Sequence, residues 1–179
     1  MTESITKNLE TLRKKVTKNW WFDCDQSETD ELADKLIEAM WDNSGLGLSA
    51  NQIGIDFRIF AMRGDTKKSS IVCFNPLIKD FSPDMNTMEE GCLSLPDVYA
   101  RVVRPEHVAI SYQNREGKED GQLASGVTAR VFQHELDHLD GILFIDRVGE
   151  LSKMRALEKA KKIKKFKARG KPVKSKTTL

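Results

Sequence analysis

The stretch His134-Glu135-Leu136-Asp137-His138 (HELDH) decides how the rest of this sequence is interpreted. Two histidines four residues apart on a helix project from the same face, so both imidazoles can reach one metal ion. Glu135 lies about 100° round the helix from His134, where it can touch a water on that ion without being a ligand. The stretch therefore predicts a metal-binding helix, as in a metal-dependent hydrolase.

The residues before this stretch have the period of a helix. Val127, Val131, His134 and His138 recur at intervals of four, three and four residues, which places them on one helix face. Gly141 follows the last of them and can end the helix. Two of the three histidines in the chain therefore lie on one face of one predicted helix.

The third ligand has two candidate sources. A hydrolytic metal site uses three protein ligands and leaves one position open for water. Peptidases of the zincin type take the third ligand downstream, where Glu150 and Glu158 lie at usable spacings. Upstream, Cys92 lies in the run Glu90 to Pro96 (EGCLSLP), and a thiolate with two imidazoles suits iron or zinc. Spacing alone leaves both sources open.

Three segments, in this order along the chain, resemble the signature motifs of the peptide deformylases. They are GLGLSANQ at 45–52, EGCLSLP at 90–96 and QHELDHLDG at 133–141. The resemblance spans most of the chain, and the predicted C-terminal helix is similar to that of the type 1 bacterial branch. It implies a hydrolase that removes the formyl group from N-formylmethionyl nascent polypeptides and releases formate.

The resemblance also implies a role for each matching residue. The metal ligands are Cys92, His134 and His138. They would hold one divalent ion, with Fe²⁺ expected and Zn²⁺, Ni²⁺ or Co²⁺ as substitutes. Glu135 would be the general acid and base, and the Gln52 side-chain amide and the Leu93 backbone N–H would stabilise the oxyanion. Ser49 stands where the family usually has alanine.

The residues expected to contact substrate come from the first two motifs and from the part of the predicted helix that precedes the third. They are Gly45, Leu46, Gly47, Glu90, Gly91, Val127, Arg130 and Val131. The two glycines of the first motif allow close approach of a peptide backbone. Leu46, Val127 and Val131 are expected to form a methionine pocket, with the Arg130 stem at its rim and its guanidinium in water. These residues have an alternative interpretation as ordinary core or surface positions.

The predicted fold class is α+β, a single compact domain with antiparallel or mixed sheets around the metal-binding helix and a C-terminal helix. A helix is expected from about Glu28 to Asp42, capped by Ser27. Strands are expected at Phe57–Met62, at Ser70–Phe74 where Pro76 closes the strand, and at His107–Tyr112. A last helix should start near Gly149 or Glu150, with its first half docked and its second half in solvent. Residues 1–150 would form the catalytic domain, and 151–179 a C-terminal helix and basic tail.

The charge of the chain is unevenly distributed. The net charge is +2, but the residues from Leu151 onward contain 12 Lys and Arg and one acid, Glu158. Such a tail either is solvated and disordered or binds an anionic partner, and the resemblance implies the ribosome. No specific DNA binding is expected.

The chain lacks the sequence signs of a secreted or membrane protein. No run approaches the roughly 18 apolar residues that a membrane span needs, and the first residues lack a secretory signal. Three widely spaced cysteines fit a reducing cytoplasm better than a disulfide framework. Cys24 and Cys73 are interpreted as small buried hydrophobes. The competing functions are therefore a zincin-type peptidase and a non-catalytic ribosome-binding module.

Overall fold

A computed structural model describes residues 3–23 and 25–169 of the chain. The helices are α1 (Leu9–Leu12), α2 (Gln26–Asp42), α3 (Gly126–Leu139) and α4 (Glu150–Ala168). The strands are β1 (Gly47–Ser49), β2 (Ile59–Met62), β3 (Ile71–Phe81), β4 (Met85–Cys92), β5 (Leu95–Pro105), β6 (His107–Gln113) and β7 (Glu119–Ser125). Among the described residues, no helix has the length and apolar character needed to cross a membrane.

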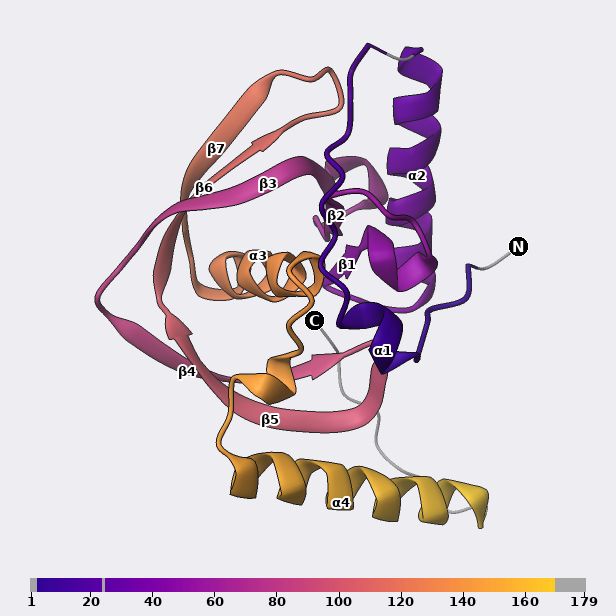
Figure 1. The fold of residues 1–179 in the computed structure, drawn as a ribbon, viewed down its shortest axis with the longest axis vertical. Coiled ribbons are helices and arrows are strands. Elements are labelled where there is room, and N and C mark those ends of the chain that lie inside the picture. The colour runs from indigo at the N-terminus through magenta and orange to yellow at the C-terminus, as the bar shows by residue number, and fades with distance from the viewer. Residues whose placement is uncertain (1–2, 24, 170–179) are drawn as a thin grey trace.

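The strands form two antiparallel sheets with α3 between them (Figure 1). One sheet has the strand order β1-β2-β3-β6-β7, and the other is the β4–β5 pair. Helix α2 lies beside β1 and β2, while α4 lies against the outer side of β5. The predicted α+β class, with a central helix and a C-terminal helix, is confirmed. Because β1 is an edge strand, one side of its backbone carries no ladder partner in this sheet.

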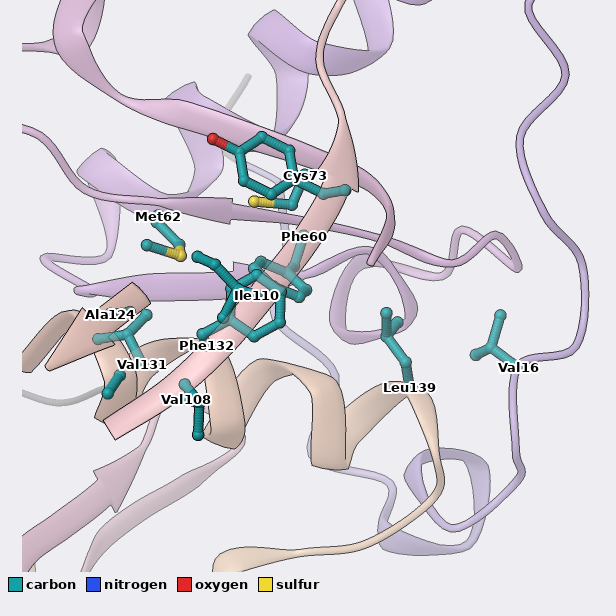
Figure 2. Close-up of a cluster of buried hydrophobic side chains, with 12 residues drawn as sticks. Val16, Phe60, Met62, Cys73, Val108, Ile110, Ala124, Val131, Phe132 and Leu139 are labelled. Atoms are coloured by element: carbon teal, nitrogen blue, oxygen red, sulfur yellow. The ribbon is translucent and has the colours of Figure 1, made fainter. Parts of the chain in front are cut away.

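An apolar cluster fixes α3 against the five-stranded sheet (Figure 2). Phe132 of α3 packs edge-to-face on Phe60 of β2 with ring centroids 4.9 Å apart, and both side chains are fully buried. Val131 and Leu139 extend this contact along the helix. Burying a side chain of this size contributes roughly 1.5–3 kcal/mol. The packing therefore holds the helix that carries His134 and His138 in one orientation.

The predicted helix at residues 28–42 is confirmed, but its start and its cap were placed too late. Helix α2 begins at Gln26, and Asp25 is the N-cap residue. The Asp25 carboxylate accepts a hydrogen bond from the backbone N–H of Ser27. Either residue type can cap a helix, so sequence alone did not separate them.

Strand β3 does not end before Pro76, as the sequence had suggested. It continues to Phe81, and its pairing with β6 shifts register between Phe74 and Leu77. Asn75 has φ = 51°, and its side chain bonds both the N–H and the C=O of Trp20. A bulge tolerates proline because it removes the residue from the hydrogen-bond ladder.

Helix α4 docks through residues near its middle rather than through the whole of its first half, as had been predicted. Leu151 and Met154 are exposed by 70% and 55%, whereas Ala156 is buried and Leu157 and Ala160 pack beside it on the β5 side. Ala156, Leu157 and Ala160 lie on one face of the helix. Apolar residues at every third position drift round a helix and cannot all face the same neighbour. The second half is not wholly in solvent either, because Lys167 pairs with Asp97 at 2.7 Å.

Candidate metal centre

Three side chains from two distant parts of the chain meet at the C-terminal half of α3. His134 and His138 project from this helix, and Cys92 is the last residue of β4. Their ligand atoms all lie within 4.8 Å of one another, and Cys92 Sγ is 3.1 Å from His138 Nε2. All three are buried. Among the described residues these three form the one group with metal-ligand geometry, so the downstream alternatives Glu150 and Glu158 are wrong.

The polar atoms at this centre fit a cation. His134 Nδ1 lies 2.9 Å from Glu90 Oε2, which leaves its buried Nε2 without a protein partner. Both carboxylate oxygens of Glu135 are likewise buried and unpartnered. Leaving such groups unsatisfied costs about 1–3 kcal/mol each, and more when they are charged. A thiolate, two imidazole nitrogens and an adjacent water would satisfy a divalent ion and these atoms together.

The charges around Cys92 favour its thiolate form over the thiol. Burial alone would raise the pKa of the Cys92 thiol, but the neighbouring imidazoles of His138 and His134 hold it well below its ordinary value. The thiolate is the form that binds metals. Burial opposes protonation of His134, but its contacts with Cys92 and Glu90 raise its pKa to about 10. Metal binding would therefore release a proton from this imidazole.

Glu90 holds His134 in place through a buried ion-pair network. Arg104 donates two hydrogen bonds to Glu90, at 2.7 and 3.0 Å. Burial alone would raise the pKa of the Glu90 carboxyl, but His134 and Arg104 hold it far below the ordinary value. Arg104 also binds Asp137 at 2.6 Å, one residue before His138. The carboxylate of Glu90 is thus occupied by protein groups rather than turned to a substrate.

The prediction for Arg130 was wrong. Its side chain is only 2% exposed, and Nη1 donates to Glu90 Oε1 at 2.8 Å. The same guanidinium reaches the backbone carbonyls of Asn86 and Val102 on the β4–β5 pair. It therefore ties α3 to that pair instead of lying in water at a pocket rim. An arginine is buried in this way when a carboxylate and carbonyls satisfy its donors.

Gln52 turns its amide nitrogen toward the metal ligands. Its Nε2 is 3.6 Å from Cys92 Sγ and 3.1 Å from Ser94 Oγ. Its Oε1 accepts hydrogen bonds from both the backbone N–H and the hydroxyl of Ser49, each at 2.9 Å. Ser49 therefore fixes which end of the amide faces the centre. Leu93 directly follows Cys92 in the turn between β4 and β5.

The first motif is glycine-rich because it lies against the Glu135 carboxylate. A Cβ added to Gly47 would lie 2.5 Å from Glu135 Oε1 and 2.7 Å from Val131 Cγ1. A Cβ added to Gly45 would lie 2.9 Å from Leu93 Cδ1. Such distances are too short for real atoms, so only glycine allows the segment to approach both α3 and the second motif.

The other expected substrate residues have different degrees of exposure. Val131 is buried beside Gly47, and Leu46 is half-buried against the same cluster. Val127, at the start of α3, is 50% exposed. Gly91 is buried on β4 opposite Tyr99. The structure thus brings Leu46 and Val131 to the centre and leaves Val127 at the molecular surface.

Cys73 differs from Cys92 in every respect that matters for metal binding. It lies in the apolar cluster between α3 and the sheet, and burial raises the pKa of its thiol well above the ordinary value. Its interpretation as a small buried hydrophobe is confirmed. Cys24, interpreted in the same way, lies outside the described residues.

Comparison with known proteins agrees with this geometry. The family model described as polypeptide deformylase matches residues 3–154. The chain belongs to the polypeptide deformylase family. A peptide deformylase of Agrobacterium fabrum is 42% identical over 136 residues, which cover 74% of this chain and 80% of that relative. A peptide deformylase of Bartonella tribocorum is 43% identical over 137 residues, covering 74% and 77%.

Solved structures of this deformylase family share the fold. A peptide deformylase from Legionella pneumophila aligns with a TM-score of 0.81 at 36% identity, covering 96% of this chain and 99% of that one. One from Synechococcus elongatus, in complex with actinonin, aligns with a TM-score of 0.80 at 33% identity, covering 89% and 86%. The chain is therefore a metal-dependent hydrolase that removes the N-terminal formyl group from nascent polypeptides.

Proposed function

We propose that Cys92, His134 and His138 hold one ferrous ion and that Glu135 is the general acid and base of deformylation. The observation that carries this proposal is the buried cluster of three ligand atoms, with the unpartnered Glu135 carboxylate one residue along α3 from His134. The same donor set also suits zinc, nickel or cobalt. A reducing cytoplasm, where a thiolate ligand and ferrous iron both persist, is the expected compartment.

In the proposed mechanism, each protein group handles a proton or a charge. When bound, the cation supplies Lewis acidity and lowers the pKa of a water toward about 7. Glu135 would accept a proton from the attacking water as its oxygen bonds to the formyl carbon, and would return it to the amine nitrogen as the C–N bond breaks and formate leaves. Burial raises the pKa of Glu135, against the lowering effect of His134 and His138. A raised pKa suits a carboxyl that must both accept and release a proton near neutral pH.

The negative charge that develops on the formyl oxygen needs fixed donors. The Gln52 amide nitrogen, held toward Cys92 by Ser49, is one proposed donor, and the Leu93 backbone N–H is the other. Removing one such donor typically costs about 2.7–4 kcal/mol of transition-state stabilisation. Both residues lie next to metal ligands, Leu93 in sequence and Gln52 in space, as this role requires.

The peptide is proposed to lie along the Gly45–Gly47 segment. Strand β1 is at the edge of its sheet, and an extended peptide can bind such an edge through main-chain hydrogen bonds. The formylated methionine would then lie beside Gly47 and Glu135, with Leu46, Val131 and Val127 as its apolar surroundings. Gly91 would face the peptide from β4.

The test is formate release from formyl-Met peptides by the wild type and by Glu135→Gln. The variant keeps the side-chain volume but has no carboxylate, so kcat should fall by at least about a hundredfold while the metal stays bound. A peptide with an ordinary internal amide but no formyl group should remain uncleaved by both. Metal-loaded wild type that releases no formate would contradict the function. An active Glu135→Gln variant would contradict the mechanism.

We further propose that residues 1–150 carry catalysis and that residues 151–179 bring the enzyme to the ribosome. Support comes from α4, whose described residues include eight Lys and Arg against Glu150 and Glu158. Most of these cations are exposed, and ribosomal phosphates attract such a surface in a salt-dependent way. Substrates emerge at the ribosome, so such binding would shorten the search for them.

A further inference from the structure

An open hollow lies beside the glycine-rich segment of the first motif. It has a volume of about 610 Å³ and is lined by Trp41, Leu46, Arg63, Gly64, Asp65 and Ser69. Leu46 belongs to both the hollow and the proposed peptide-binding segment. The hollow is therefore continuous with that segment, and the metal ligands do not line it.

Arg63 presents a fixed positive charge to this hollow. Its guanidinium carbon lies 3.7 Å from the ring centroid of Trp41, a cation–π contact. Nη1 donates to the Gly45 carbonyl at 3.2 Å, and the backbone N–H donates to the Leu46 carbonyl at 2.8 Å. The Trp41 ring is itself held by a hydrogen bond from Nε1 to Ser70 Oγ at 3.0 Å. Arg63 is thus positioned by the same segment that would bind the peptide.

The charge of Arg63 is not neutralised by an ion pair within the described chain. The ion pairs of the described residues involve other arginines, namely Arg13, Arg58, Arg104, Arg115, Arg130 and Arg147. A guanidinium has five N–H donors, and the Gly45 carbonyl uses only one of those on Arg63. Within the loop from Arg63 to Ser70, Arg63 and Asp65 line this hollow, whereas Lys67 and Lys68 line another pocket and give the loop a net positive charge.

The geometry also says which part of a peptide would meet Arg63. In the proposed function the formyl group lies at the metal ligands, where Gly47 lies so near Glu135 that an added Cβ would be 2.5 Å from its Oε1. Beyond Gly47 the chain is closed, since Leu48 and Ser49 are fully buried. A bound peptide therefore leaves in the other direction, past Gly45. Two residues of extended chain span about 7 Å, so the third residue of the peptide would lie opposite Gly45.

We propose that Arg63, supported by Trp41, forms a subsite for an acidic side chain at the third or fourth residue of the substrate. This inference rests on the proposed function, because it assumes that the peptide follows the Gly45–Gly47 segment. A carboxylate there would pair with the guanidinium through charge-assisted hydrogen bonds. Exposed pairs of this kind are weak, so the expected preference is about fivefold.

The test compares kcat/KM for formate release from C-terminally amidated formyl-Met-Ala-X-Ala peptides, with X as Glu, Ala or Lys. The wild type should favour Glu over Lys about fivefold at low salt, and less at 1 M salt, where charges are screened. Arg63→Met should bring the Glu/Lys ratio to within about twofold of one, and Arg63→Lys should keep part of the preference. Lys118→Met removes the same charge from the β6–β7 turn and should leave the ratio unchanged.

The ratio is insensitive to misfolding, because a partly unfolded variant loses activity on all three peptides equally. A wild type without preference for Glu, or an Arg63→Met variant that keeps it, overturns the subsite. A preference seen only between formyl-Met-Ala-Ala as free acid and as amide would mean that Arg63 binds a terminal carboxylate, which also overturns it. Absence of formate from every peptide would instead overturn the proposed function, and the subsite with it.

Discussion

His134 uses its two ring nitrogens differently, and this difference explains why Glu90 belongs to the metal centre. Nδ1 is bonded to the Glu90 carboxylate, so the unpartnered Nε2 is the atom turned to the other ligands. A carboxylate behind a ligating histidine fixes the tautomer and the ring orientation. In the proposed mechanism, Glu90 would therefore act on the reaction through His134.

A pair of cysteine variants tests the metal ligands. Cys92→Ala should weaken metal binding by more than about a hundredfold. Mutating a residue that only hydrogen-bonds to a metal ligand already lowers metal affinity by about 10- to 100-fold. Cys73→Ala removes an equally buried thiol in the apolar cluster and should leave one metal per chain. Metal analysis after anaerobic purification measures both. Equal metal content in the two variants would contradict the assignment of Cys92.

Gly47→Ala tests how closely the first motif must approach Glu135. The added methyl group would overlap Glu135 and Val131, so the carboxylate must move. Displacing a catalytic group by about 1 Å can cost about a hundredfold, and we expect kcat to fall by about ten- to a hundredfold. Gly149→Ala is the matched control, because its Cβ would meet no atom within 4 Å. Steady-state kinetics should separate the two, and a fully active Gly47→Ala would show that the contact is unimportant.

At the scale of elements, the sequence predicted what depends on local spacing. The HELDH helix and the residues of the three motifs were found because each signal lies within a few neighbouring positions. The burial of Arg130 depends instead on its ion pair with Glu90, forty positions away. No local sequence pattern separates a buried arginine from one at a pocket rim. Strand β7 was missed because its residues are mostly polar and exposed, and β3 was cut short because a bulge absorbs Pro76.

Asp146 forms ion pairs with two cations from distant parts of the chain, and these pairs should make the stability of the fold depend on pH. Asp146 binds Arg13 at 2.8 and 3.0 Å and Lys153 of α4 at 3.2 Å. Burial alone would raise the pKa of Asp146, but Arg13, the Leu143 N–H and Lys153 lower it to about 2. A carboxyl with a depressed folded-state pKa stabilises the fold above its ordinary pKa, and this contribution is lost as the pH falls toward 2.

Asp146→Asn should therefore lower the free energy of unfolding by up to about 1 kcal/mol at pH 6. The difference from wild type should shrink to about half of that at pH 3. Urea unfolding at pH 6, 4 and 3 measures it. Glu116→Gln, in the exposed β6–β7 turn, is the control and should show little difference at any pH. A pH-independent effect of Asp146→Asn would mean that its charge is not what matters.

At the scale of the whole molecule, the candidate metal centre and the proposed ribosome-binding surface lie on opposite sides of the β4–β5 pair. The inner side of this pair carries Cys92 and Glu90 toward α3, and the outer side of β5 supports α4 (Figure 1). Only a few residues of α4 pack against β5, and most of the lysines and arginines of this helix are exposed. A change to the outward face of α4 should therefore leave the metal centre intact.

This separation leads to a prediction for ribosome binding. Replacing Lys161, Lys162, Lys164 and Lys165 with glutamine removes four exposed charges from α4. If each contacts a phosphate, the slope of log affinity against log salt should decrease by about three to four. The rate of deformylation of free formyl-Met peptides should stay within about twofold, because these lysines lie outside the centre.

Four exposed lysines elsewhere, Lys7, Lys14, Lys79 and Lys118, give a control with the same net charge. Cosedimentation with ribosomes at several salt concentrations measures the slopes, and equal slopes for the two variants would show that α4 is not the binding surface.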